Sequence, residues 1–442
     1  MRGSYMQRPE TPAAVLTELY LAGVAAAAPG PVLIEALSAQ PLRPPPQKVW
    51  IVAVGKAAGA MAGAAVGHLA GLGTVPAGGV VITPEPADVP TGLRPLTGDH
   101  PIPGQGSAAA ADALDWLAAR TQAGDEAWVL LSGGATSLAA APVPDLKAGD
   151  LQSLYRALLN SGLDISRMNT VRKRFSRWGA GRLALALYPA RVRAFVISDV
   201  IGDDIAVIGS GPCVPDQTRA HEVRELLDAA GLWDEMPEAV DRHLRRVEED
   251  PRLETPKSGH PAFETTEWEI IAGNRLSVQA AARRAAELGL RPQALGEPVA
   301  GEAARAGIDL AQRLVEQPGG TCLVAGGETV VSMAGGTGGL GGRCQELALA
   351  AAAELAAAPD TAASLLAAGT DGRDGPTDAA GAIVDGRTWQ KIWDQGRDPG
   401  ADLKHHDAYR ALDGVGALLR TGLTGTNVMD LMIGLAPFPA PR

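Results

Sequence analysis

The chain has 442 residues, more than one hydrophobic core usually serves, so two domains are expected. Its formal net charge is -11 without a conspicuous run of like charges, which argues against a nucleic-acid or anionic-membrane surface. The three scattered cysteines, and the lack of an apolar stretch near the ~20 residues of a membrane helix, predict a cytoplasmic protein without a disulfide framework.

The first predicted element is a helix with Thr11 as its N-cap and Pro12 in its first turn. We expect this helix to end near Ala28, where Pro29-Gly30 should stop it. The proline-rich segment 41–46 then predicts a stiff connector, because each proline fixes φ and removes a hydrogen-bond donor.

A recurring unit begins at Lys48, in which a short apolar run leads through a small polar or glycine-rich loop into a helical pattern. Buried runs separated by helical stretches are typical of parallel strands joined by crossovers, so a doubly wound α/β fold is expected. The apolar runs cover residues 48–54, 77–83, 126–131 and 192–198.

The polar, proline-containing segment 248–261 is the best candidate for a domain boundary. We therefore predict an N-terminal domain over residues 1–258 and a C-terminal α/β domain over residues 259–442. The second domain is expected to restart with a strand at 268–274.

Two apolar runs of the second domain, 321–327 and 328–333, follow one another directly. This order suggests neighbouring strands around a turn, and hence a mixed sheet.

Carboxylates and glycines follow the apolar run that ends at Ser198. Asp199, Asp203 and Asp204 come first, and Gly209-Ser210-Gly211-Pro212 comes next. In α/β proteins ligands bind outside the carboxyl ends of the strands. A cation or a hydroxyl group is the natural partner of carboxylates in that position.

Lys56 follows a predicted strand and opens a helix, where the backbone favours an anion. Because the spacing of a Walker A loop is absent, a solvated lysine is an equal alternative. The loop 132–137, which contains Ser132, Gly133, Gly134 and Ser137, predicts either an anion-holding nest of amides or a simple strand-to-helix turn. Asn169 and Lys173 share one face if their segment is helical.

Six glycines between Gly335 and Gly342 precede Arg343 and a long Ala/Leu helix. Gly336-x-Gly338-x-x-Gly341 formally matches a dinucleotide fingerprint, but the acidic candidate, Asp360, lies in a loop after the helix. A phosphate loop with Arg343 as a fork-shaped anion ligand fits better.

The remaining polar loops give weaker signals. The segment 370–378 has three carboxylates without calcium-loop spacing, and Asn427 is a possible helix N-cap. The histidines lack zinc spacing, and His100 alone lies in a motif-like loop. No G-x-S-x-G elbow indicates a serine hydrolase.

Taken together, ten stretches resemble the type-2 glycerate kinases, two-domain enzymes whose carboxyl-terminal half is called the MOFRL domain. The resemblance runs from about Thr11 to Leu435. In chain order the stretches are VGKAAGAM, GDHPIP, LLSGG, MNTVRKRFS, ISDVIGDD with GSGPCVPD, AGN, GGET, GGRCQELALA, GTDGRDGPTDAAGA and TGTNVMDL.

The resemblance implies a Rossmann-like first domain, a mixed α/β second domain and an active site in the cleft between them. It also implies ATP-dependent phosphorylation of the 2-hydroxyl of D-glycerate with a divalent cation. Lys56 and Arg343 match functional residues of the family, and Asp199 is the expected third catalytic residue, binding Mg²⁺ with Asp203. The expected contacts with substrate or phosphate are Ser132, Gly133, Gly134, Ser137, Asn169, Lys173, Asn274, Glu328, Gly338, Gly339, Asp371 and Asn427.

Several positions depart from the usual pattern of the family. Cys344 stands where Asn is common, Gly179 where Lys is frequent, and Ile201 and Ile205 where Pro is frequent. None of these departures removes Lys56, Asp199 or Arg343, but they bear on the choice of substrate.

Two other classes of function stay open at this point. The glycine fingerprint favours an NAD(P)-dependent hydroxypyruvate reductase, and a non-catalytic sugar-acid-binding protein would keep the pocket without needing Lys56 or Asp199. In each case the expected partners are small molecules rather than nucleic acid or membrane, and the protein is a monomer or a homodimer.

Overall fold

The computed structural model describes residues 11–40, 46–333, 338–358 and 362–437. The chain forms two compact units. One, which we call the continuous unit, spans Pro29–Ile271. The other, the split unit, combines the helix at Pro12–Ala26 with the described chain from Ala272 onward.

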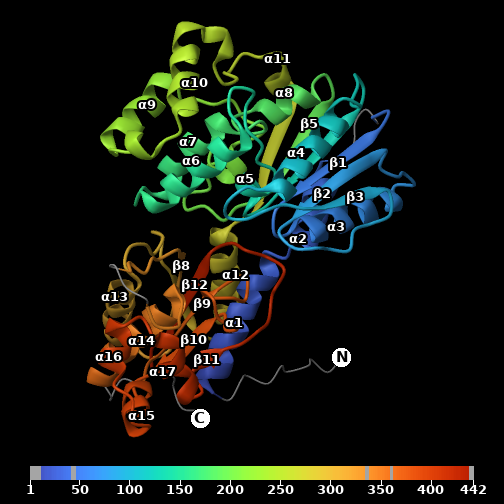
Figure 1. Ribbon diagram of the computed structural model, residues 1–442. Coiled ribbons are helices and arrows are strands. Elements are labelled where there is room, and N and C mark those ends of the chain that lie inside the picture. The colour runs from blue at the N-terminus through green and yellow to red at the C-terminus, as the bar shows by residue number, and fades with distance from the viewer. Residues whose placement is uncertain (1–10, 41–45, 334–337, 359–361, 438–442) are drawn as a thin grey trace. The chain divides into compact units, whose positions relative to one another are not determined.

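Six strands form the sheet of the continuous unit (Figure 1). They are β1 (Val49–Val54), β2 (Gly78–Thr83), β3 (Leu93–Thr97), β4 (Glu126–Leu131), β5 (Arg191–Ile197) and β6 (Thr266–Ala272). Their order is β3-β2-β1-β4-β5-β6, and β1 to β5 pair in parallel. The order reverses between β1 and β4, which makes the carboxyl ends of these strands the switch point of a doubly wound sheet.

Helices cover both faces of this sheet, because alternate strand residues point to opposite sides. Val52 and Val54 of β1 share a core with α4, α5 and α8, whereas α3, with α2 packed on it, contacts β1, β2 and β4 from the other side. The helices of these layers are α2 (Pro29–Ala39), α3 (Ala58–Gly71), α4 (Gln105–Ala118), α5 (Ala135–Leu138), α8 (Arg182–Leu187) and α11 (Pro261–Glu264).

A further group of helices in the continuous unit has a hydrophobic core of its own. Leu154 and Tyr155 contribute to it from one helix, and Val240 and Leu244 from another. The group consists of α6 (Ala148–Asn160), α7 (Ile165–Phe175), α9 (Ala220–Ala229), η2 (Trp233–Glu235) and α10 (Glu238–Glu249), with η1 (Ile208–Ser210) and η3 (Pro251–Leu253) in the adjoining loops.

The sheet of the split unit is mixed, as predicted. Its strands are β7 (Arg291–Ala294), β8 (Thr321–Gly327), β9 (Ser364–Gly369), β10 (Gly381–Asp385), β11 (Leu418–Leu419) and β12 (Asp430–Leu435). In the order β11-β10-β9-β12-β8-β7, only β7 and β8 are parallel.

The predicted reason for the mixed sheet was wrong, because residues 328–333 form no strand beside β8. The Glu328 N–H donates instead to Val299 O (2.9 Å), and the Val330 N–H donates to Gly301 O (2.9 Å). The antiparallel character comes from β12, which lies between β8 and β9.

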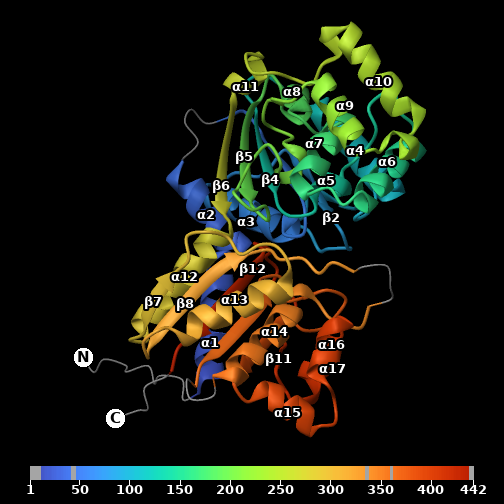
Figure 2. The ribbon, with the colours of Figure 1, turned by 90° about the vertical axis from the view of Figure 1, so that its left-hand side faces the viewer.

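Helices also cover both faces of the second sheet (Figure 2). Leu323 and Ala325 of β8 pack under the helices of one face, whereas Cys322 and Val324 pack under those of the other. The first face carries α13 (Ala303–Val315), α14 (Arg343–Ala357), α15 (Thr388–Asp394), α16 (Pro399–Lys404) and α17 (Ala408–Gly414), and the second carries α1 (Pro12–Ala26) and α12 (Asn274–Glu287).

The division into units differs from the expected boundary after Ser258. The strand expected to restart the second domain is β6, an edge strand of the first sheet. Segment 254–257 also stays with the continuous unit, because Glu254 pairs with Arg174 and the Thr255 hydroxyl donates to Asp216 (2.8 Å).

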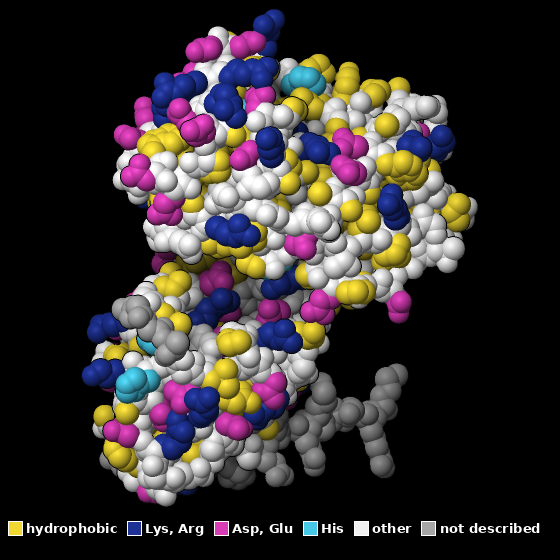
Figure 3. All heavy atoms as spheres, viewed as in Figure 1, with side chains coloured by type: hydrophobic (Ala, Val, Ile, Leu, Met, Phe, Trp, Pro, Cys, Tyr) yellow, Lys and Arg dark blue, Asp and Glu magenta, His cyan; other side chains and the backbone are white. Residues whose placement is uncertain are grey.

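The N-terminal helix also differs from the expectation. It ends at Ala26, and Pro29 begins α2 instead of following the end of a helix, because proline suits the first turn. No single helix of the described chain is long and apolar enough to cross a membrane; α1 and α2 reach that length only when joined across the break between them. On the faces drawn in Figure 3, acidic and basic side chains are interspersed on each unit.

Candidate functional site

The loops after β1 and β4 are tied together at the switch point of the first sheet. The Lys56 N–H donates to Gly133 O (3.0 Å), and the Ala57 N–H donates to the Ser132 hydroxyl (3.0 Å). Gly55 adopts φ +129°, and a Cβ there would collide with the Ser132 side chain. The position therefore requires glycine, and Lys56 leaves the sheet from a fixed backbone.

The loop 132–137 uses its hydroxyls for structure. Ser132 is buried and accepts the Ala57 N–H, and the Ser137 hydroxyl donates to Gly134 O (3.4 Å). The Gly133 and Gly134 N–H groups, by contrast, have no acceptor within the described chain. The part of this loop that is available to an anion is therefore its pair of backbone amides.

Asp199 lies just beyond the end of β5, half-buried and within electrostatic reach of Lys56. Burial raises the pKa of Asp199, and the Lys56 ammonium partly offsets that rise. The sequence-predicted pair of Lys56 and Asp199 is thus brought together, from the first and fifth strands of one sheet.

The fit of a divalent cation follows from the available carboxylates. Asp203 has a left-handed backbone at φ +54°, and Asp204 accepts the Ala206 N–H (2.9 Å). No three His, Cys, Asp or Glu side chains among the described residues gather as a ready-made metal site. Mg²⁺ commonly takes one or two carboxylates and fills its shell with water and phosphate oxygens. Asp199 and Asp203 suit a cation of that kind.

His100 and Arg172 also belong to this region, although neither was among the predicted site residues; His100 was noted only as the histidine of a motif-like loop, and Arg172 only as part of the stretch MNTVRKRFS. A Cβ on Gly134 would lie 3.4 Å from His100 Cδ2, so the imidazole lies over the loop 132–137. Burial lowers the pKa of His100, and the charges of Lys56 and Arg172 lower it further. Burial and the two neighbouring cations therefore favour the neutral form of the imidazole.

Asn169 and Lys173 do lie on one helix, α7, but their environments differ. Lys173 is buried and forms an ion pair with Asp216 (Nζ to Oδ1, 2.8 Å). Burial raises the pKa of Asp216, but Lys173 and two bonds from Thr218 outweigh this and bring the pKa below its usual value. Asn169 Oδ1 is buried and accepts no hydrogen bond from the described residues.

Arg343 is the first residue of α14, in the split unit. Its Nε and Nη2 donate to Asp430 (2.6 and 2.9 Å), and its Nη1 lies 2.9 Å from Glu328 Oε1. Burial lowers the pKa of Arg343, but these two carboxylates outweigh it and raise the pKa above its usual value. The two carboxylates therefore fix the orientation of the Arg343 guanidinium and neutralise its charge.

A protein carboxylate already occupies the N-terminus of α14. Asp374 accepts the N–H groups of Cys344 (3.2 Å) and Gln345 (2.8 Å). Burial raises the pKa of Asp374 to about 7, although these two bonds favour the charged form. A dinucleotide pyrophosphate would need this helix end, so the geometry disfavours the fingerprint.

The glycine segment before α14 packs against the chain near α17. The Gly339 N–H donates to His405 O (2.7 Å), and a Cβ on Gly338 would collide with Met333. Gly336 and Asp360, the other parts of the fingerprint, lie outside the described residues.

The other predicted contacts of the split unit shape the loop that leads to Asp430. Asn274 Nδ2 donates to Val428 O (2.8 Å) and Asp430 O (2.9 Å). Asn427 Oδ1 accepts the Met429 N–H (3.2 Å) in a turn before β12, so its expected role as a helix N-cap was wrong. Asp371 Oδ1 accepts the Arg373 N–H (3.0 Å).

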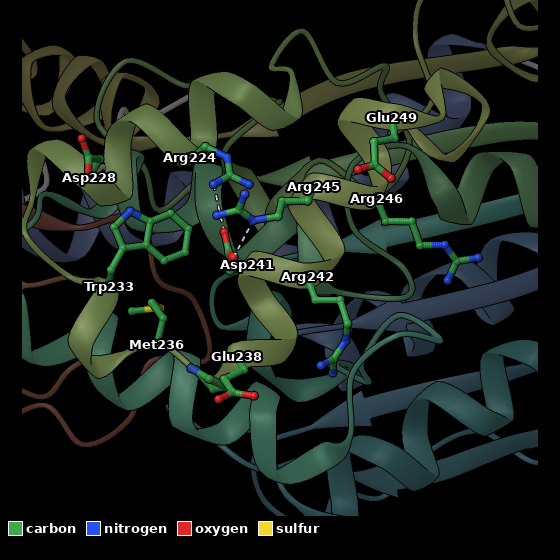
Figure 4. A pocket seen from close by; sticks show the side chains of 11 residues that line it. Arg224, Asp228, Trp233, Met236, Glu238, Asp241, Arg242, Arg245, Arg246 and Glu249 are labelled. Carbon is green, nitrogen blue, oxygen red and sulfur yellow. Dashed lines mark hydrogen bonds and ion pairs between the residues drawn. The ribbon is translucent and has the colours of Figure 1, made fainter.

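The groove drawn in Figure 4 lies apart from these residues, along α9, η2 and α10. Asp241 pairs there with Arg224 (2.9 Å) and Arg245 (2.8 Å), so the charges at its centre are satisfied within the groove. None of the sequence-predicted site residues lines it.

Comparison with known proteins decides the family. Residues 15–245 match the family model described as a domain of unknown function, DUF4147, and residues 321–430 match the MOFRL family. The chain is 38% identical to the D-glycerate 2-kinase of Thermotoga maritima over 402 residues, which cover 88% of this chain and 90% of that protein. The chain belongs to the MOFRL-type glycerate kinase family.

Two further relatives of this family bear on fold and function. The crystal structure of a glycerate kinase from Thermotoga maritima superposes with a TM-score of 0.84 at 35% identity, covering 97% of this chain and all of that one. A protein of Agrobacterium vitis that is provisionally named a hydroxypyruvate reductase is 36% identical over 425 residues, 94% of this chain and 93% of its own length.

The family resemblance and the fold class seen in the sequence are thereby confirmed. The roles of individual residues, the domain limits and the position of the active site stay predictions.

Proposed function

We propose that this chain transfers the terminal phosphoryl group of ATP to the 2-hydroxyl of D-glycerate, giving 2-phosphoglycerate and ADP. The observation that carries the proposal is that Lys56 lies within electrostatic reach of a half-buried Asp199 at the strand ends, in a chain of the glycerate kinase family. Phosphoryl transfer depends on positioning and charge neutralisation, and this pair supplies one group for each need.

Asp199 is the proposed general base for the attacking hydroxyl. A carboxylate with a raised pKa holds a proton better than an ordinary aspartate, which favours proton transfer from an alcohol in the transition state. Lys56 stays close enough to stabilise the charged form of Asp199 before the reaction.

Lys56 and the loop 132–137 are proposed to neutralise the transferring group. The lysine is a mobile point charge, and the free amides of Gly133 and Gly134 add donors that need no reorganisation. Mg²⁺ bound by Asp199 and Asp203 would neutralise phosphate charge when it is present.

Arg343 is proposed to act in the same reaction through its exposed side. Asp430 is buried and holds one edge of the guanidinium, whereas Glu328 is partly exposed and is the partner that a phosphate oxygen can replace. Asp430 is then a positioning residue. Its role is tested by the orientation of the Arg343 side chain and not by the binding of substrate.

One pair of assays tests the activity. The protein is mixed with D-glycerate, ATP and MgCl₂ while ADP is followed, and in parallel with hydroxypyruvate and NADH while NADH loss is followed. We expect ADP formation without NADH oxidation. NADH oxidation alone would support the reductase, and neither signal would support a non-catalytic binding protein.

A further inference from the structure

Arg172 is a buried cation that lacks an acidic partner. Its side chain lies on α7 with 6% of the residue exposed, and no ion pair joins it to a carboxylate in the described chain. Its buried Nε makes no hydrogen bond within the described chain, and its Nη2 lies 3.9 Å from the Met168 sulfur. Burial lowers the pKa of Arg172, because the charged form has lost its water.

The next two residues of α7 do have acidic partners, so the lack of one is specific to Arg172. Lys173 pairs with Asp216, and Arg174 pairs with both Asp216 and Glu254. Three consecutive buried cations thus divide into two that the protein neutralises and one that it does not. An unpaired buried charge costs stability, so the fold bears a cost at Arg172 that packing alone does not explain.

The surroundings of Arg172 place it beside the proposed catalytic pair. The guanidinium carbon lies 4.8 Å from the centre of the Tyr155 ring, and the Tyr155 hydroxyl contacts Thr136 O (3.5 Å). The charge of Arg172 reaches His100, and His100 is also within reach of Lys56. Lys56 in turn acts on Asp199, so these four side chains belong to one electrostatic neighbourhood.

Asn169 supplies a second independent observation. It precedes Arg172 by three residues on α7, so the two side chains leave the same side of the helix. The Asn169 residue is 6% exposed, and its buried Oδ1 has no donor among the described residues. A buried acceptor and a buried cation left unsatisfied one helical turn apart suit a ligand with both a negative charge and a donor.

We propose that Arg172 binds the carboxylate of the 2-hydroxy acid substrate, with Asn169 accepting a hydrogen bond from one of its hydroxyls. This inference rests on the proposed function and extends it to the part of the substrate that does not react. A guanidinium presents two parallel N–H groups that match the two oxygens of a carboxylate.

The chemistry of a 2-hydroxy acid favours a carboxylate over a nucleotide phosphate at Arg172. Asp199 and Lys56 take the reacting hydroxyl and the phosphoryl group, and the carboxylate of a 2-hydroxy acid is bonded to the carbon that carries that hydroxyl. The charges of Arg172 and Lys56 both act on His100, and Lys56 also acts on Asp199. A neutral His100 can donate a hydrogen bond there without adding charge.

The test is a set of calorimetric titrations without turnover. D-Glycerate, ADP and inorganic phosphate are each titrated into the wild type, R172Q and R167Q. Arg167 is the matched control, since it lies on the same helix but its side chain is 65% exposed and pairs only with Asp164. We expect R172Q to weaken D-glycerate binding roughly 10- to 100-fold and to leave ADP and phosphate unchanged, while R167Q binds all three normally.

Thermal unfolding separates binding from folding. Ligand-free R172Q should melt no lower than the wild type, because it removes an uncompensated charge. If R172Q is insoluble, R172K takes its place; it keeps the charge but lacks the fork, and should still weaken D-glycerate binding. A lower melting temperature with unchanged D-glycerate binding would overturn the proposal, as would a loss confined to ADP or phosphate. A wild type that binds D-glycerate but forms no ADP would overturn the kinase activity and leave the role of Arg172 standing.

Discussion

The centres of the two units treat their cations in opposite ways. In the continuous unit the buried Arg172 forms no ion pair with a carboxylate of the described chain, and the charges of Arg172 and Lys56 both act on His100. In the split unit Arg343 is held by Asp430 on one side and by Glu328 on the other. The first centre leaves a buried cation without a carboxylate partner, whereas the second holds its cation between two carboxylates.

This contrast distinguishes a cation that is available to bind a ligand from a cation whose orientation is fixed by the protein. A cation left without a partner by the fold is available to an anionic ligand, whereas a cation held by two carboxylates contributes a fixed direction. The helix ends agree, since the Asp374 carboxylate fills the N-terminus of α14 while the amides of Gly133 and Gly134 stay open.

The strongest test of the first centre is D199N. Removing the proposed base should lower kcat roughly 100- to 10,000-fold. The wild type should also lose activity as pH falls through the raised pKa of Asp199, and D199N should lack that acidic limb. The control is D204N, which keeps the oxygen that accepts the Ala206 N–H and should turn over normally. Equal kcat for D199N and the wild type would refute the role.

K56A should have the next largest effect. Loss of the ammonium beside the transferring group should reduce kcat/KM roughly 100- to 1,000-fold without changing the melting temperature, because Lys56 is exposed. K48A removes an exposed lysine before the other end of β1 and should be active. Turnover by K56A at the wild-type rate would exclude the assignment.

The same substitution at two arginines tests the contrast itself. R343Q leaves the buried Asp430 without its cation and should lower the free energy of unfolding by about 3 kcal/mol, at the low end for buried pairs because Arg343 is one-third exposed. R172Q should cause no such loss, since no carboxylate depends on it. Urea unfolding of both variants measures the two changes in the free energy of unfolding. Equal destabilisation by R343Q and R172Q would contradict the contrast between a paired and an unpaired arginine.

Asp374 predicts an effect on stability that depends on pH. Its pKa is about 7 in the folded protein, above the value near 4 of an unfolded aspartate, so the folded state binds more protons between these values. The Asp374 contribution to stability is present below pH 4 and is lost as pH rises toward 7, by up to about 1.4 kcal/mol per pH unit. D374N should lack this part of the dependence in urea unfolding at several pH values. If the free energy of unfolding of D374N depended on pH as that of the wild type does, this role of Asp374 would be contradicted.

Local rules were enough to predict the first centre in outline. Lys56 and Asp199 follow apolar runs that were predicted as parallel strands, and the carboxyl ends of parallel strands meet at one edge. The choice of these two residues came from the family resemblance. The mixed character of the second sheet was also predicted, although the direct succession of 321–327 and 328–333 was not its cause.

Contacts between distant segments could not be predicted in the same way. Arg172, Lys173 and Arg174 are adjacent and alike in sequence, and only the folded positions of Asp216 and Glu254 decide which of them lacks a partner. The partner of Arg343 lies 87 positions further along the chain, on the last strand. No local pattern links residues so far apart.

The division of the chain also has a consequence for synthesis. All of Pro29–Ile271 is inserted between α1 and the rest of the split unit. The apolar face of α1, which includes Leu16 and Leu19, finds its neighbours on α12, β9 and β12 only after that insertion has left the ribosome. At roughly 5–20 residues per second the delay is on the order of 10 to 50 seconds, so the first helix to be made is among the last to dock.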